Sequence, residues 1–89
     1  MKILRVKGDT LYLYDLTRFI ENNDLDEGDR FGISWKVKKK KKLRSYRVIR
    51  FRFWACDNCG PITEITLKRG EKSIVLDNHF GAGWFSMND

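Results

Sequence analysis

The chain has 89 residues, 42% of them hydrophobic and 13% aromatic, a composition that excludes a disordered chain and favours one folded domain over residues 1–89. Its 18 Lys and Arg against 12 Asp and Glu give a net charge of +6. No apolar run approaches the roughly 18 residues of a membrane span, and the first residues show no signal-peptide pattern, so we expect a cytoplasmic protein without a membrane partner.

The first residues predict a β-hairpin. Two short apolar segments, Ile3–Lys7 and Thr10–Tyr14, flank Gly8–Asp9. Glycine at the first central position suits a tight type II′ turn, because that position requires a positive φ. We therefore expect two antiparallel strands that pair with each other.

A short helix is expected next. Leu16, Phe19 and Ile20 recur at the spacing of one helix face. Asp15 is a suitable N-terminal cap, and Asn22–Asn23 can end the helix. No other segment of the sequence indicates a helix.

The turn after this helix leads into a strand. Gly28, within Leu25–Asp29, can supply the positive φ of a turn. Apolar and polar residues then alternate from Arg30 to Val37, as in a half-buried strand. The segment Asn23–Phe31 resembles the turn that enters a strand in B3-type DNA-binding pseudobarrels; this likeness covers nine residues, and it implies no binding residue in this chain.

The following strand, Leu43–Trp54, changes phase in its middle. Its apolar residues move from even to odd positions at Val48–Ile49. One extra residue on one strand restores a single apolar face, so the pattern predicts a β-bulge at this point.

We expect the run Lys38–Lys42 to form the loop of a hairpin between these two strands. In that register Trp35 faces Tyr46 and Phe31 faces Phe51, which places the apolar residues of both strands on one face. The opposite face then becomes uniformly basic.

The segment from Arg30 to Cys56 is the main candidate binding surface, because it contains eleven Lys and Arg and no acidic residue. The rest of the chain, with seven Lys and Arg and all 12 acidic residues, has a net charge of −5. Such segregation favours a polyanionic partner, above all a nucleic acid. The expected phosphate-binding residues are Arg30, Lys36, Lys38, Lys39, Lys40, Lys41, Lys42, Arg44, Arg47, Arg50 and Arg52, with Trp54 available to stack on a base.

A simpler interpretation of the same charge is structural. Lysines can protect an edge strand from aggregation and keep a small protein in solution. The acidic residues of Glu21–Asp29 would then neutralise the hairpin within the same molecule.

The C-terminal third predicts further β-structure. Thr63–Lys68 and Lys72–Asp77 are joined by the turn Arg69–Glu71, and Phe80–Met87 adds a final irregular strand. The order ββαββββ predicts an α+β fold, mainly β: a twisted antiparallel sheet or small open barrel of about six strands with one short helix.

The two cysteines and the single histidine are candidate metal ligands. Cys56 and Cys59 have the spacing that lets two thiolates bind one metal ion, and His79 with Asp57 or Asp77 can complete a zinc site within the chain. A second copy could instead supply two more cysteines. Because a single pair of this spacing also occurs as two ordinary thiols in a tight turn, we expect no cofactor, with zinc as the alternative.

His79 is also the only side chain whose unperturbed pKa lies near neutrality. Beside many cations it would suit RNA cleavage by general acid–base chemistry, with Ser73 and Ser86 as candidate nucleophiles. No spacing among the three marks a catalytic triad. We therefore expect no enzyme, with a small ribonuclease as the alternative.

The function that the sequence favours is a nucleic-acid-binding module that grips the phosphate backbone through the hairpin Arg30–Trp54. RNA is preferred over DNA, because no helix suits the DNA major groove and aromatic side chains are available to stack on unpaired bases. A second hypothesis is an accessory or inhibitor protein whose basic face docks on an acidic protein surface.

Overall fold

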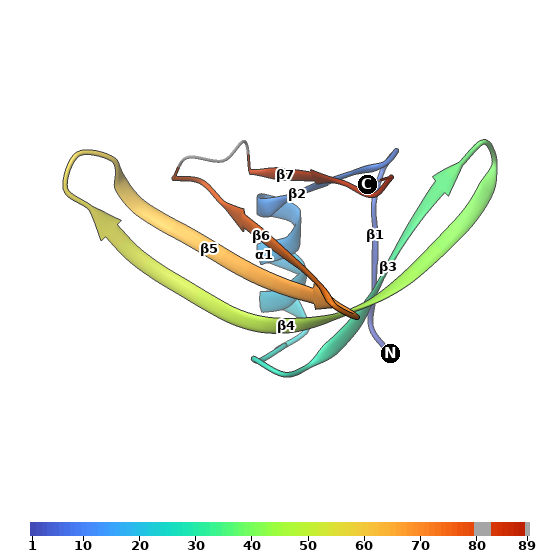
Figure 1. Cartoon of the computed structure of the whole chain (residues 1–89), viewed down its shortest axis with the longest axis horizontal. Coiled ribbons are helices and arrows are strands. Elements are labelled where there is room, and N and C mark those ends of the chain that lie inside the picture. The colour runs from blue at the N-terminus through green and yellow to red at the C-terminus, as the bar shows by residue number, and fades with distance from the viewer. Residues whose placement is uncertain (80–82, 89) are drawn as a thin grey trace.

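The computed structural model describes residues 1–79 and 83–88 and confirms a mainly β protein with one short helix (Figure 1). The predicted element order is also confirmed. The elements in chain order are β1 (Ile3–Arg5), β2 (Thr10–Tyr12), α1 (Leu13–Asn22), β3 (Arg30–Val37), β4 (Lys40–Cys56), β5 (Gly60–Arg69), β6 (Lys72–Asp77) and β7 (Trp84–Ser86).

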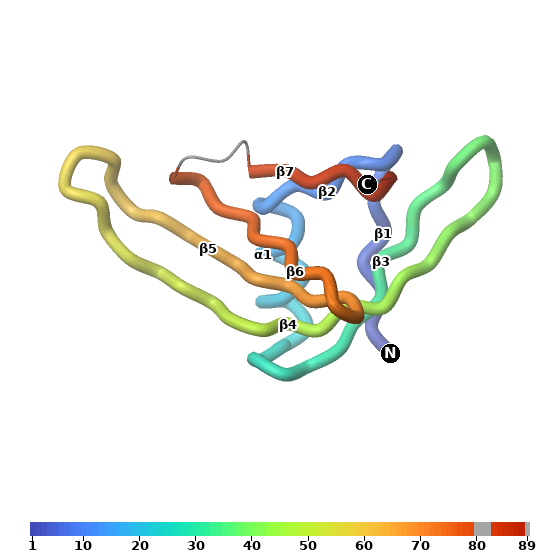
Figure 2. The backbone as a smooth tube through the Cα atoms, viewed as in Figure 1, coloured from blue at the N-terminus to red at the C-terminus, as the bar shows by residue number. Residues whose placement is uncertain are grey.

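The strands form one large open sheet and one small sheet. Five strands are ordered β1-β3-β4-β5-β6, and β2 pairs with β7. Because β1 runs parallel to β3 while the other pairs are antiparallel, the large sheet is mixed and not purely antiparallel as predicted. Its edge strands β1 and β6 do not pair with each other, so the sheet is not closed into a barrel. The hairpins β3–β4 and β4–β5 extend to opposite sides of the molecule, with α1 and the β2–β7 pair between them (Figure 1, Figure 2).

The predicted N-terminal hairpin is wrong. Gly8 has the expected positive φ, 64°, but β1 joins the large sheet beside β3 and β2 joins β7. An isolated pair of short strands is marginally stable, whereas each of these strands gains a larger apolar surface. Leu4 packs against the core and Leu11 is only 1% exposed.

Helix α1 begins two residues before the predicted cap. Tyr12 is the N-cap residue and makes no side-chain capping bond, while Asp15 lies in the first turn. A carboxylate there still stabilises the helix, because it faces the positive end of the helix dipole. The end of the helix at Asn22 and the positive φ of Gly28, 93°, are as predicted.

The core lies between α1, the β2–β7 pair and one face of the large sheet, which we call the covered face. At its centre Phe31 contacts the rings of Phe19 and Tyr46, with centroids 5.5 and 6.2 Å apart. The residues with at most 3% exposure that form this core are Leu11, Leu16, Phe31, Ile33, Trp35, Tyr46, Val48, Ile65, Leu67, Leu76 and Met87.

Strands β3 and β4 pair in a different register from the predicted one. Lys38–Lys39 alone form the turn, with φ values of 48° and 69°, and the next three lysines belong to β4. The residue that faces Tyr46 is therefore Phe31 and not Trp35. Phe51, predicted to face Phe31, instead pairs with Ile65 of β5. A two-residue turn with two positive φ values matches the twist of the flanking strands, and the lysine run contains no apolar residue that would oppose this register.

The predicted β-bulge is confirmed. The register of β4 against β5 shifts between Val48 and Arg50. The extra residue changes the parity of β4, so that Arg47 and Arg50 share one face, opposite Lys68 and Thr66 of β5.

The final strand is shorter than predicted. Of the segment Phe80–Met87, Trp84–Ser86 forms β7, and residues 80–82 lie outside the described residues. Within the part of the chain that the structure describes, no helix combines the length and the apolar character needed to cross a membrane.

Candidate nucleic-acid interface

The face of the large sheet that α1 does not cover gathers cations from four strands. Phe31, Ile33 and Trp35 of β3 are buried in the core, so the even-numbered residues of this strand project to the other side. Strand pairing extends this side across β1, β4 and β5. Its Lys and Arg, which we call the basic face, are Arg5, Arg30, Lys36, Lys41, Arg47, Arg50, Arg52 and Lys68.

Most of the residues predicted for one face are indeed brought together. The bulge makes this possible, since without it Arg47 would project opposite to Arg50 and Arg52. Two members, Arg5 and Lys68, were not predicted, because they belong to strands outside the hairpin and only the strand order brings them beside it.

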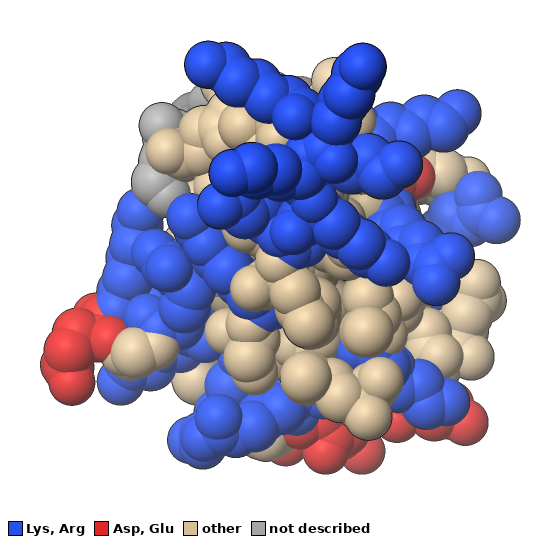
Figure 3. Space-filling model, turned by 90° about the vertical axis from the view of Figure 1, so that its right-hand side faces the viewer, with Lys and Arg blue, Asp and Glu red and all other residues tan. Residues whose placement is uncertain are grey.

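The tip of the β3–β4 hairpin is basic on both sides, which corrects the predicted one-sided arrangement. Lys38 and Lys39 occupy the turn, and Lys40 and Lys42 alternate with Lys41 along β4. All five lysines are exposed. Seen from this end, Lys and Arg cover the upper part of the molecule, and acidic side chains appear mainly at its lower edge (Figure 3).

Arg44 is engaged within the protein. Its side chain projects to the covered face and lies over the ring of Trp35, 4.8 Å from the centroid. It also donates a hydrogen bond of 2.9 Å to the carbonyl oxygen of Met87. This predicted phosphate-binding residue therefore connects the hairpin to the C-terminal segment.

A small apolar patch divides the basic face. Ile3 and Leu43, 44% and 55% exposed, lie over the backbone of Gly32. A Cβ atom at Gly32 would lie 3.1 Å from Leu43 and 3.5 Å from Ile3, so glycine permits this close cover. The cations toward the hairpin tip are thus separated from those at the bulge.

A depression lies beside the bulge, where β3, β4 and the β5–β6 turn meet. Its volume is about 410 Å³. The lining residues, which define the basic depression, are Arg30, Ser45, Tyr46, Arg47, Lys68, Arg69 and Gly70. Four of the seven are cations and none is acidic, so the site favours an anion.

Two residues that line the basic depression also have a buried polar atom without a hydrogen-bond partner. The hydroxyl of Tyr46, a residue only 2% exposed, and Nε of Arg69 make no hydrogen bond among the described residues. Buried donors are almost always satisfied in folded proteins. Both atoms are closed to solvent, and the Tyr46 ring packs on Phe31 in the core, so an anion in the depression does not contact either atom in this conformation.

Glu64 is a carboxylate that contacts the basic face. Its Oε2 lies 3.7 Å from Arg50 and 3.8 Å from Arg52, both of whose side chains are about half exposed. Exposed pairs of this kind contribute about 0–1 kcal/mol, so they leave both guanidinium groups available to a partner. Among residues 1–79 and 83–88, the acidic stretch Glu21–Asp29 makes no ion pair with the hairpin, so it does not neutralise the hairpin by direct contact.

Trp54 ends the basic face and is only partly accessible. Arg52 lies over its ring at 5.5 Å, and His79 meets it edge-on with centroids 4.8 Å apart.

More exposed aromatic side chains lie on the small sheet. Tyr12 and Trp84, 52% and 51% exposed, face each other across the β2–β7 pair. Their pairing joins the two ends of the chain, and no local sequence pattern indicates it.

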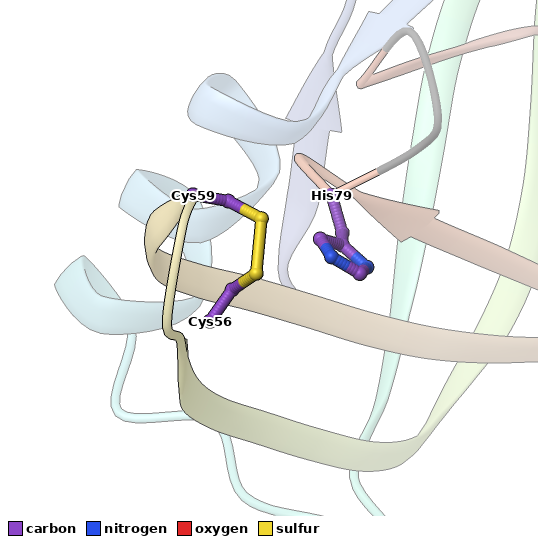
Figure 4. A group of neighbouring side chains, drawn as sticks. All are labelled: Cys56, Cys59 and His79. Atoms are coloured by element: carbon purple, nitrogen blue, oxygen red, sulfur yellow. A yellow bond between two sulfur atoms is a disulfide. The ribbon is translucent and has the colours of Figure 1, made fainter.

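The cysteine pair lies at the tip of the β4–β5 hairpin. Cys56 and Cys59 form a disulfide, in place of the two free thiols expected in this turn. His79 follows β6, and its ring faces the two sulfur atoms (Figure 4). One ligand-type atom from each of the three residues lies within 4.8 Å of the others. Asp77 accepts a hydrogen bond from the backbone N–H of His79 at 3.0 Å.

The candidate residues for RNA cleavage do not lie together. Ser73 lies near the beginning of β6 and His79 beyond its end. Ser86 pairs with Thr10 in the small sheet.

No protein family, curated protein or solved structure matches this chain. A function for this protein is therefore inferred from its own geometry.

Proposed function

We propose that the protein binds nucleic acid, RNA in preference to DNA, by holding the phosphate backbone on the basic face. The observation that supports this most strongly is the basic depression, which is lined by four cations and by no carboxylate. We also propose that this function is exercised in the cytoplasm.

The electrostatics of the sheet favour such a ligand. Arg30 stands directly opposite Arg47, and Arg47 opposite Lys68, in adjacent strands. Like charges in directly opposite positions destabilise a sheet. A phosphate relieves this repulsion, and a guanidinium group binds it through two parallel hydrogen bonds.

The spacing of the cations suits a linear polyanion. Alternate residues of a strand lie about 7 Å apart, and adjacent strands about 5 Å apart. From Lys41 to Arg52, strand β4 displays cations along a path of about 35 Å. A backbone that follows β4 meets the hairpin tip at one end and the basic depression near the middle.

Salt dependence and ligand choice test the proposal. In a mobility-shift assay with the full chain, single-stranded RNA, single-stranded DNA and duplexes of equal length are compared at several salt concentrations. We expect binding to RNA that is largely independent of sequence and weakens steeply with salt. Absence of binding to every nucleic acid at low salt would refute the proposal.

Copurification addresses the alternative of a protein-binding accessory. A partner protein that copurifies with the chain and stays bound at high salt, without nucleic acid, would favour that alternative. Excess absorbance at 260 nm in the purified protein, removed by high salt, would support nucleic-acid binding.

A further inference from the structure

We infer that Cys56, Cys59 and His79 form a zinc site when the two cysteines are reduced. Their ligand atoms already lie within 4.8 Å of one another. Around tetrahedral zinc, with Zn–S about 2.3 Å and Zn–N about 2.0 Å, neighbouring ligand atoms stand about 3.5 to 3.8 Å apart. Small side-chain rotations therefore convert this cluster into three corners of a tetrahedron, and a water molecule occupies the fourth.

The backbone holds His79 beside the cysteine turn independently of the disulfide. The side chain of Asn78 accepts a hydrogen bond of 2.9 Å from the N–H of Thr63 and donates one of 3.5 Å to the carbonyl oxygen of Pro61. These bonds fasten the segment after β6 to the beginning of β5. Asp77 and Trp54 further fix the backbone and the ring of His79.

Reduction must precede metal binding. In the reaction, two molecules of a thiol reductant, RSH, supply two electrons and two protons, so that the disulfide becomes two thiols and the reductant becomes RSSR. Zinc then binds both sulfur atoms as the two thiol protons pass to water, and His79 binds through a neutral ring nitrogen. A reducing compartment favours this form over the disulfide.

Zinc would connect the tip of the β4–β5 hairpin to the segment after β6. The neighbouring Trp54 lies at the end of the basic face, but the ligands themselves are separate from the basic depression. Metal binding can therefore be tested without nucleic acid, and it does not depend on the proposed function.

Cobalt provides the test. The full chain is reduced with a phosphine, freed of reductant under argon and titrated with Co²⁺. We expect the visible bands of tetrahedral Co²⁺ and a thiolate-to-cobalt charge-transfer band that saturate at one ion per chain and disappear when Zn²⁺ is added. The oxidised wild-type protein should show neither, and this comparison requires no substitution that could disturb folding.

Variants identify the ligands. Cys56→Ser should remove at least half of the charge-transfer intensity, because one of the two thiolates is lost. His79→Ala should weaken Co²⁺ binding by more than about 100-fold, since even groups that only support metal ligands account for about 10- to 100-fold. Asn58→Ala, in the same turn but without a ligand atom in the cluster, is the matched control and should bind as the wild type does. A reduced wild-type protein without tetrahedral Co²⁺ bands, saturation at half an ion per chain, or an unchanged affinity of His79→Ala would overturn the inference.

Discussion

Neutralising the basic depression should weaken RNA binding by an amount that follows from its charge. The variant Arg30→Gln/Arg47→Gln/Lys68→Gln removes three of the four cations that line it. On a single strand each phosphate contact contributes about −0.7 to the slope of log K against log salt, so the slope should become less steep by about 2. If the electrostatic part vanishes near 1 M salt, affinity falls about 500-fold at 50 mM and about 30-fold at 200 mM.

Fluorescence anisotropy with a labelled single-stranded RNA, measured at four or five salt concentrations, provides both the affinity and the slope. The charge-matched control is Lys2→Gln/Lys7→Gln/Arg18→Gln, whose three cations belong neither to the basic face nor to the lining of the basic depression. Long-range attraction alone would affect both triple variants alike. Equal losses of affinity and equal slopes would therefore refute a specific role of the basic depression, provided that circular dichroism shows both variants folded.

Three further predictions concern stability, measured by urea denaturation. Phe31→Ala should lower the free energy of unfolding by about 3–5 kcal/mol, because the ring is fully buried. Phe53 is 69% exposed, so Phe53→Ala should change this free energy by no more than about 0.5 kcal/mol. Similar losses in the two variants would show that the core is assigned wrongly. Arg44→Ala should lower the free energy of unfolding by about 1–2 kcal/mol, because the hydrogen bond and the ring contact of Arg44 are lost. Lys41 is exposed, so a loss no larger than that of Lys41→Ala would contradict the structural role of Arg44. Replacing Lys38–Lys39 with Asn-Gly should stabilise the protein by about 1–2 kcal/mol, because both positions have positive φ; a destabilised variant would exclude this turn.

The bounds of β3 and β6 and the bulge in β4 were predictable because their signals are local. The second strand, predicted to reach Tyr14, instead ends at Tyr12, because Leu13 and Tyr14 belong to α1. The alternation from Arg30 to Val37 marks β3, and the change of parity at Val48–Ile49 marks the bulge, since each pattern depends on neighbouring residues alone. The end of the helix at Asn22 was also predictable from neighbouring residues. Strand partners were less predictable: the Gly8–Asp9 turn is present, but the strands on either side of it join different sheets.

For the candidate site too, the sequence shows the local features but not those that depend on strand pairing. The concentration of Lys and Arg between Arg30 and Cys56 is visible in the sequence, and these residues contribute most cations of the basic face. The basic depression is not visible, because Lys68 and Arg69 lie about 20 residues beyond Arg47 and meet it only through the β4–β5 pairing. For the same reason the distance from His79 to the cysteine turn could not be judged from spacing.

By itself, the sequence determined the order of the secondary-structure elements and the charge of the central hairpin, because hydrophobic periodicity and composition are properties of contiguous residues. Only the tertiary structure decided which cations share a face, which one is engaged in an internal contact and which distant residues complete a site. Those outcomes depend on strand order and register, and these are selected by how the whole apolar surface is buried at once.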